Sequence, residues 1–186
     1  EVPAVTTNAS GEAYVLINMN NYDLELRVNT TGVDDATGAH IHTGRIGTNG
    51  DVLVALEQST TDAGTWVTPA NTMINADIFT VLASGGHYVN FHTPANTSGE
   101  IRGQILTDNY QLVTFPLTGM QEVPAVDTMA SGSGYALVNM DNYHLELRAL
   151  TEGVSDATAA HIHTGRIGMN GDVLAALEQS SDNMNL

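Results

Sequence analysis

The chain has 186 residues, of which 21 are acidic and five basic, so its formal net charge is −16 with neutral histidines. This balance argues against nucleic acid and anionic membrane surfaces as partners, because both require clustered cations. No apolar run approaches the roughly 20 residues of a membrane span, and the absence of cysteine excludes disulfides. With only 14% charged residues, the composition is typical of a β-rich protein that is secreted or held at the cell surface.

Short β-strands are predicted along most of the chain. Apolar and charged residues alternate over residues 22–28 (YDLELRV), which is the two-residue period of a half-buried strand. Further strands are predicted over residues 13–19, 39–43, 51–56, 88–93 and 100–106, with turn residues between them. Residues 75–85 differ, because a capping Asn, an apolar stretch and two glycines predict a short helix. The spacing predicts an all-β fold, an antiparallel Greek-key sandwich or barrel with one short helix.

A long internal repeat organises the chain. Residues 1–59 align without a gap with residues 122–180, at an offset of 121 and with about three quarters of the positions identical. Counterparts of residues 61–107 do not follow the second copy. We therefore expect a complete domain over residues 1–110, a linker or leading strand over 111–120, and the N-terminal half of a second domain over 121–186.

Four motifs occur in order after the opening Glu-Val-Pro-Ala: AHIHTG at residues 39–44, NGDVL at 49–53, GHYVNFHT at 86–93 and GEIRGQ at 99–104. This series closely resembles the CHRD (chordin) domain family, with one complete and one truncated tandem copy. The resemblance implies a secreted or surface β-domain. It also implies an immunoglobulin-like barrel similar to copper–zinc superoxide dismutase.

The histidines of these motifs are candidate metal ligands. His40 and His42 are two apart on one predicted strand, so both project from the same face with Cα atoms roughly 7 Å apart. Two imidazoles placed in this way can share one ion, and neutral imidazole suits Cu, Zn or Ni. His92 on a second strand is a candidate third ligand. His87 lies five residues earlier, faces the opposite way in a regular strand and could join only through a bulge or from the loop.

The likeness to superoxide dismutase implies the same set: His40 and His42 match its His-x-His copper ligands, His92 resembles its third ligand, and Arg102 is a candidate for its anion-guiding arginine. The chain lacks a bridging histidine, a zinc loop and the disulfide, so we expect at most an isolated mononuclear site. The alternative is structural. The His-x-His pair could hydrogen-bond loop backbone, with Thr43 and Asn90 as partners. Arg102 could pair with carboxylates or carbonyls, for instance those of Glu100 or Asp51.

Other candidate sites are weaker. His161 and His163 repeat the pair in copy two, where a third ligand would have to come from another chain or from residues beyond Leu186. Calcium is a less favoured cofactor than copper, with loop oxygens supplied by Asp34, Asp35, Asn49 and Asp51. Glycosylation acceptor triplets begin at Asn8, Asn29 and Asn96.

No catalytic constellation is found, so we expect a protein that is not an enzyme. The first functional hypothesis is an extracellular structural or interaction protein, whose half-domain is completed by a neighbouring chain in a surface array or fibre. Its partners would then be copies of itself or other surface proteins. The second hypothesis is a copper-binding module built on the His-x-His strand.

Overall fold

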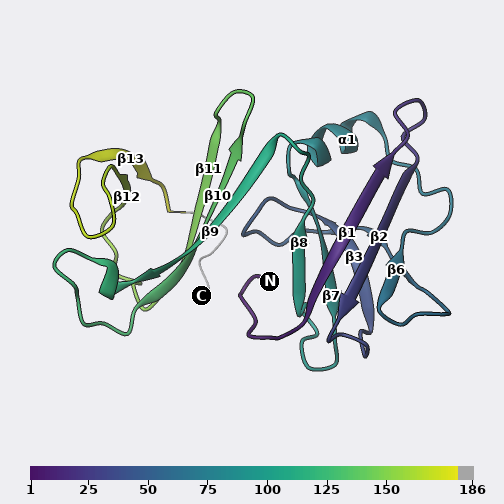
Figure 1. Ribbon diagram of the computed structural model, residues 1–186, viewed down its shortest axis with the longest axis horizontal. Coiled ribbons are helices and arrows are strands. Elements are labelled where there is room, and N and C mark those ends of the chain that lie inside the picture. The colour runs from purple at the N-terminus through teal and green to yellow at the C-terminus, as the bar shows by residue number, and fades with distance from the viewer. Residues whose placement is uncertain (180–186) are drawn as a thin grey trace. The chain divides into compact units, whose positions relative to one another are not determined.

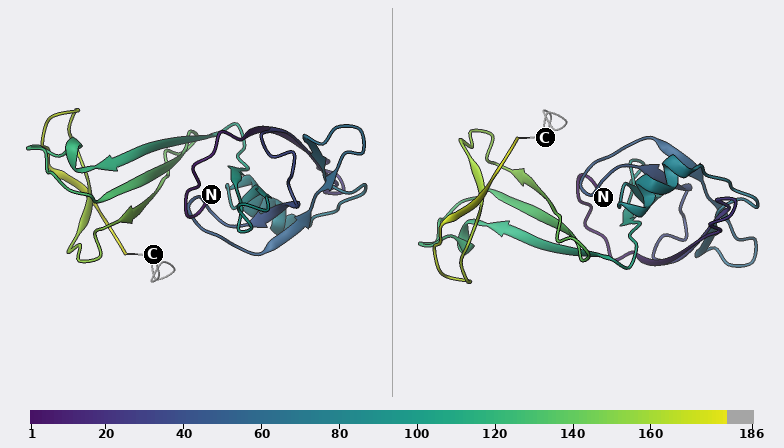
Figure 2. Two further views of the ribbon diagram at one scale, coloured as in Figure 1. Left: turned by 90° about the horizontal axis from the view of Figure 1, so that it is seen from below. Right: turned by 90° about the horizontal axis from the view of Figure 1, so that it is seen from above.

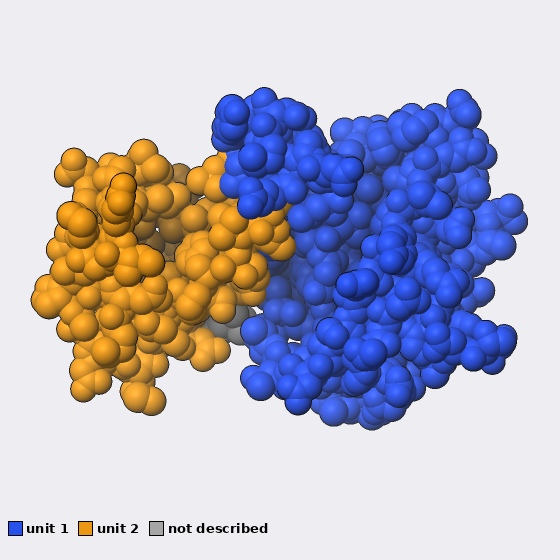
Figure 3. Space-filling view, in the orientation of Figure 1, with its two compact units in different colours: residues 1–111, 138–144 blue, residues 112–137, 145–186 orange. Residues whose placement is uncertain are grey.

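The computed structural model describes residues 1–179 and confirms the predicted all-β fold with one short α-helix. The chain divides into two compact units (Figure 3). Unit 1 comprises residues 1–111 and 138–144, and unit 2 comprises residues 112–137 and the described residues from 145 onward. No helix within residues 1–179 has the length and apolar character needed to cross a membrane.

Two four-stranded antiparallel sheets form unit 1, and the chain passes from one to the other after each pair of strands. The first sheet has the order β1 (Ser10–Ile17), β2 (Leu24–Thr31), β6 (Thr65–Val67) and β5 (Glu57–Gln58). The second sheet has the order β4 (Val52–Ala55), β3 (Gly38–Thr43), β7 (His87–His92) and β8 (Ile101–Gln104). Figures 1 and 2 show the sheets as two layers. The fold is thus a sandwich, and the described strands close no barrel.

The core lies between these layers. Every second residue of β2 is buried, as the alternation in residues 22–28 predicts, and Leu26 is completely buried. From the second sheet, Ile41 of β3 and Phe91 of β7 enter the same apolar cluster. Because successive side chains of a strand point to opposite faces, the even-numbered residues of β3 and β7 lie on the outer face of the second sheet.

The helix α1 (Ala76–Ala83) lies across one end of the sandwich (Figures 1 and 2). It begins at Asn75, whose Oδ1 accepts a hydrogen bond of 2.8 Å from the backbone N–H of Ile78. This contact satisfies one of the free donors of the first turn. Leu82 anchors the helix in the core cluster. The helix predicted over residues 75–85 is therefore confirmed, one residue shorter at its start and two at its end.

Most of the remaining strands lie in the second copy of the repeat. One sheet has the order β11 (Leu145–Glu152), β10 (Ser131–Asn139) and β9 (Tyr110–Thr118), and β12 (Ala160–His163) pairs with β13 (Val173–Leu177). A short 3-10 helix, η1 (Gly119–Gln121), follows β9. The segment expected as a linker or leading strand thus forms most of β9 and η1. Within the described residues, β11 and β12 each have one unpaired edge, whereas their counterparts β2 and β3 are paired on both sides.

Candidate metal centre

Strand register brings the three predicted ligands to one place. In the antiparallel pair of β3 and β7, His42 lies opposite Tyr88, His40 opposite Asn90, and Gly38 opposite His92. Directly opposed residues of an antiparallel pair point to the same side of the sheet. We call the outer surface formed by His40, His42, Tyr88, Asn90 and His92 the histidine face.

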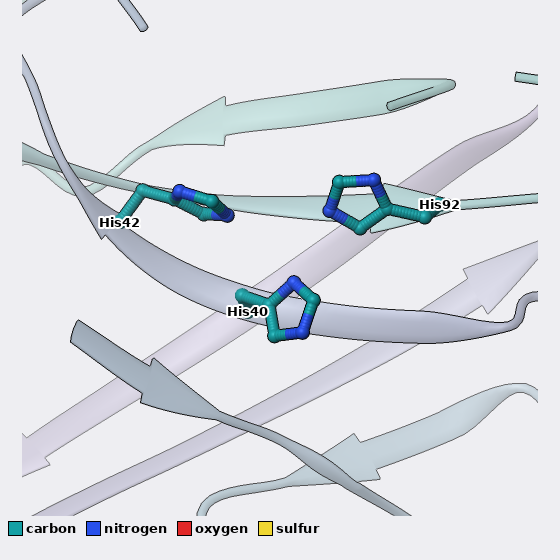
Figure 4. Close-up of side chains that lie close together, drawn as sticks. All are labelled: His40, His42 and His92. Carbon is teal, nitrogen blue, oxygen red and sulfur yellow. The ribbon is translucent and has the colours of Figure 1, made fainter. Parts of the chain in front are cut away.

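One ring nitrogen from each of His40, His42 and His92 lies within 4.8 Å of the other two. Figure 4 shows these nitrogens turned toward the space between the three rings. Three nitrogens of this cluster, Nδ1 of His40 and Nε2 of His42 and of His92, are buried and have no hydrogen-bond partner. Buried polar atoms are rarely left unpaired in native proteins, so such a cluster indicates a missing partner.

Backbone carbonyls orient two of the rings. Nδ1 of His42 lies 2.8 Å from the carbonyl oxygen of Gly50, and Nδ1 of His92 lies 3.0 Å from that of Thr97. A carbonyl oxygen can only accept, so each Nδ1 carries a proton, and in the neutral ring each Nε2 has a lone pair. This hydrogen bond from the second ring nitrogen to a carbonyl is the arrangement that fixes the tautomer of metal-binding histidines.

The loop after β3 can provide its carbonyl only because glycine stands at position 50. A Cβ at Gly50 would collide with the carbonyl oxygen of Thr43. The backbone N–H of Thr43 in turn bonds the carbonyl of Asp51 at 2.9 Å, and the N–H of Gly50 donates to the Tyr88 hydroxyl at 3.2 Å. The loop is thereby held against the histidine face, where His42 is only 8% exposed.

Electrostatics favour a neutral imidazole at His40. Burial lowers the pKa of His40 below its ordinary value of 6.5, and the neighbouring His92 and His42 lower it further because positive charges on them would repel its own. A neutral imidazole is the form that binds a metal ion. Around neutral pH the His40 ring is therefore ready to act as a ligand.

A stack of three side chains supports the site on one side. The rings of His42 and Tyr88 are nearly parallel, with an interplanar angle of 7° and centroids 5.0 Å apart. The Arg102 guanidinium carbon lies 3.3 Å from the Tyr88 ring centroid, which is a cation–π arrangement. Arg102 also donates to the loop carbonyls of Thr48 at 2.8 Å and Arg45 at 3.1 Å. The carbonyl pairing expected of Arg102 is thus observed.

Gln104 and Tyr88 were not among the predicted site residues. The side-chain amide of Gln104 donates to three carbonyls, those of Gly44 and Gly85 at 2.8 Å and of His87 at 3.0 Å. It thus ties the loop after β3 to the start of β7. The sequence could have indicated both residues, because residues two apart on a strand share a face. Gln104 is two residues from Arg102 on β8, and Tyr88 is two residues from Asn90 on β7.

His87 is not brought to the cluster. It is 1% exposed and has the odd-numbered parity of Val89 and Phe91, which point into the core. Burial lowers the pKa of His87. As the strand geometry predicts, no bulge between β3 and β7 turns it toward the other histidines.

Copy two repeats part of the arrangement. The rings of His161 and His163 have centroids 5.7 Å apart, and Nδ1 of His163 lies 3.0 Å from the carbonyl oxygen of Gly171, as His42 does from Gly50. Both rings are exposed. In residues 1–179 no third His, Asp or Glu joins them, and the acidic loop residues proposed for calcium, Asp34, Asp35 and Asp51, form no such group either.

The complete copy is thus a β-sandwich domain with a three-histidine cluster on the outside of one sheet. The comparison with protein families then identifies it: the CHRD domain model matches residues 1–105 and 113–185, and the chain belongs to the CHRD domain family with two tandem copies. The resemblance in the sequence motifs is thereby confirmed. No curated protein and no solved structure gave a significant match.

Proposed function

We propose that the first copy is a transition-metal-binding β-domain that holds one copper ion between His40, His42 and His92. The observation that carries this proposal is the convergence of three buried ring nitrogens without partners. We further propose that the domain has no catalytic role. We also propose that it is extracellular, which is in keeping with the family.

Two of the three converging nitrogens are acceptors when their rings are neutral. His42 and His92 have used their N–H groups on loop carbonyls, so their Nε2 atoms are acceptors that face each other across the cluster. Nδ1 of His40 has no hydrogen-bond partner, and with the ring proton on Nε2 it presents a third lone pair to the cluster. A single cation would satisfy all three lone pairs at once, and this supports a metal ion at the cluster.

The donor set favours copper or zinc. All three groups are imidazoles, and the cluster contains no carboxylate. Calcium and magnesium bind oxygen ligands, whereas imidazole suits copper, zinc and nickel, and copper(II) forms the strongest complexes of the divalent series. Nitrogens that share one ion at about 2.0–2.1 Å lie at most some 4 Å apart, so a small rotation of the rings closes the site.

Copper titration of the full chain tests this proposal. We expect one tightly bound Cu²⁺ per chain, with nitrogen hyperfine structure in its electron paramagnetic resonance spectrum. His40→Ala, His42→Ala and His92→Ala should each abolish this binding while circular dichroism shows an intact fold. His144→Ala, which removes an exposed histidine outside the cluster, is the matched control and should bind copper as the wild type does. Equal binding by all four variants would rule out the site.

A second function, extracellular assembly, is favoured by a specific difference between the copies. Leu24 is 1% exposed, but its counterpart Leu145 is 45% exposed, and Ile46 at 5% contrasts with a fully exposed Ile167. The unpaired edges of β11 and β12 lie on the same copy. We propose that a second chain of the same sequence covers these surfaces, which would build a surface array or fibre.

Sedimentation velocity over a wide concentration range tests assembly. The wild type should form concentration-dependent oligomers, and Leu145→Glu should shift the distribution to monomer because it places a charge in the covered surface. Leu16→Glu changes a leucine of copy one that is 66% exposed and serves as the control. A wild type that stays monomeric at every concentration would contradict assembly and leave the metal proposal unaffected.

A further inference from the structure

A fourth buried polar atom lies at the histidine face. Asn90 is 2% exposed, and its Oδ1 is buried without a hydrogen-bond partner. Asn90 lies directly opposite His40 in the β3–β7 pair, and it is two residues from His92 on the same strand. Its side chain therefore shares the outer face with the three histidines.

The register places Asn90 in the middle of the cluster. Three successive rows of the pair carry His42 with Tyr88, His40 with Asn90, and Gly38 with His92. His42 and His92 thus lie in the rows on either side of the central row, which His40 and Asn90 form. Asn90 is thus flanked on β7 by Tyr88 and His92 and faced across the strand pair by His40.

We propose that Asn90 is the fourth donor of this site, with its carboxamide oxygen bound to the ion that the three imidazoles hold. This inference rests on the proposed metal-binding function and adds to it the residue that sets metal preference. An amide oxygen is an acceptor with no proton to give, so it too needs a cation or a donor. No other His, Cys, Asp or Glu of residues 1–179 is within the cluster to occupy the fourth position.

The donor type has a consequence for selectivity. A carboxamide oxygen is a hard ligand, which favours Cu²⁺ and Zn²⁺ and contributes little to the soft Cu⁺ ion. With Asn90 in place, the site should hold the divalent ion more tightly relative to Cu⁺ than three imidazoles alone would. Asn90 is thus a specificity-determining residue, and its removal should act on one oxidation state of copper more than on the other.

The test compares the wild type with Asn90→Leu and Asn90→Asp, measuring Cu²⁺ and Cu⁺ affinities by competition with chelators and recording the Cu²⁺ resonance spectrum. Leucine keeps the approximate volume and removes the oxygen. We expect Asn90→Leu to weaken Cu²⁺ binding by roughly 10-fold or more, the range seen when a group that supports a metal site is lost, to leave Cu⁺ affinity nearly unchanged, and to alter the Cu²⁺ hyperfine splitting. Asn90→Asp, which keeps the oxygen and adds charge, should bind Cu²⁺ at least as tightly as the wild type.

Val89→Ala is the matched control, because Val89 is the neighbouring residue of β7 and points into the core. It should lower the melting temperature without changing the spectrum. If Asn90→Leu folds and keeps the wild-type Cu²⁺ spectrum and the wild-type ratio of affinities, Asn90 is a buried structural residue and the inference is wrong, while the three-histidine site stands. If the wild type itself binds no copper or zinc, both proposals fail together.

Discussion

The carbonyl of Gly50 offers a way to weaken the candidate site without touching a ligand. Gly50→Ala would place a Cβ against the carbonyl oxygen of Thr43, so the loop must move away from β3. The 2.8 Å hydrogen bond that holds Nδ1 of His42 would then be broken. The His42 ring would lose its fixed tautomer and orientation, although all three imidazoles would still be present.

Loss of such an outer partner costs about 10–100-fold in metal affinity, which corresponds to roughly 1.4–2.7 kcal/mol of binding free energy. We therefore expect Gly50→Ala to bind Cu²⁺ within this range below the wild type, whereas His42→Ala should lose tight binding altogether. Isothermal titration with a competing chelator measures both values. Thermal unfolding of the metal-free proteins reports any general loss of stability separately.

Copy two contains a matched control for this experiment. Gly171 occupies the same place in the second loop, its carbonyl oxygen lies 3.0 Å from Nδ1 of His163, and a Cβ there would meet the carbonyl of Thr164. Gly171→Ala thus makes the same change beside a pair that has no third histidine. It should leave the tight Cu²⁺ site unchanged. Wild-type affinity in Gly50→Ala, or an equal loss in both variants, would refute the reasoning.

Three further predictions concern the fold itself. Hydrogen bonds, the first of them from Thr7, hold the pKa of Glu100 below its ordinary value of 4.5, so the native state binds fewer protons than the unfolded state there. Glu100→Gln should therefore lower the melting temperature above pH 4.5, and this difference should shrink as the pH falls through the native pKa. Leu26→Ala, at a completely buried position, should cost about 2–5 kcal/mol in urea unfolding. Asn75→Ala removes the cap on Ile78 and should cost about 1 kcal/mol in the same assay.

The first two of these predictions have a control at an exposed position. Glu25→Gln changes an exposed carboxylate on the outer side of β2 and should give a nearly pH-independent difference. Leu16→Ala changes a leucine that is mostly exposed and should cost well below the Leu26 value. A pH-independent effect of Glu100→Gln, or equal costs at the two leucines, would contradict the described contacts.

Periodicity alone predicted much of the fold because the strands of unit 1 bury one face. The alternation in residues 22–28 placed Leu24, Leu26 and Val28 on one side, and all three are in the core. β6 was not predicted, since its three residues, Thr65 to Val67, are too few to show a period. It exists because it pairs with β2 in the folded chain, and such tertiary pairing leaves no local signal in the sequence.

Part of the candidate site could likewise be predicted from the sequence, and part could not. The parity of two strands predicts that His40, His42 and His92 share a face and that His87 does not, and the register agrees. The carbonyls of Gly50 and Thr97 could not be predicted, because they depend on how two loops fold back over the sheet. Asn90 appeared in the sequence only as a hydrogen-bond partner for the histidines. Its significance comes from being buried and unpaired, which no sequence pattern reports.

The two His-x-His pairs share one local sequence but differ in burial, and this gives the chain an internal standard for chemical reactivity. His161 and His163 are exposed, whereas His42 is 8% exposed and the inward nitrogens of the first cluster are covered. An electrophile that acylates imidazoles should therefore modify copy two first. A limited dose of such a reagent should modify His161 and His163 and leave the three-histidine cluster of the first copy free to bind. Copper that remains after this treatment can then be assigned to the first copy without a single substitution.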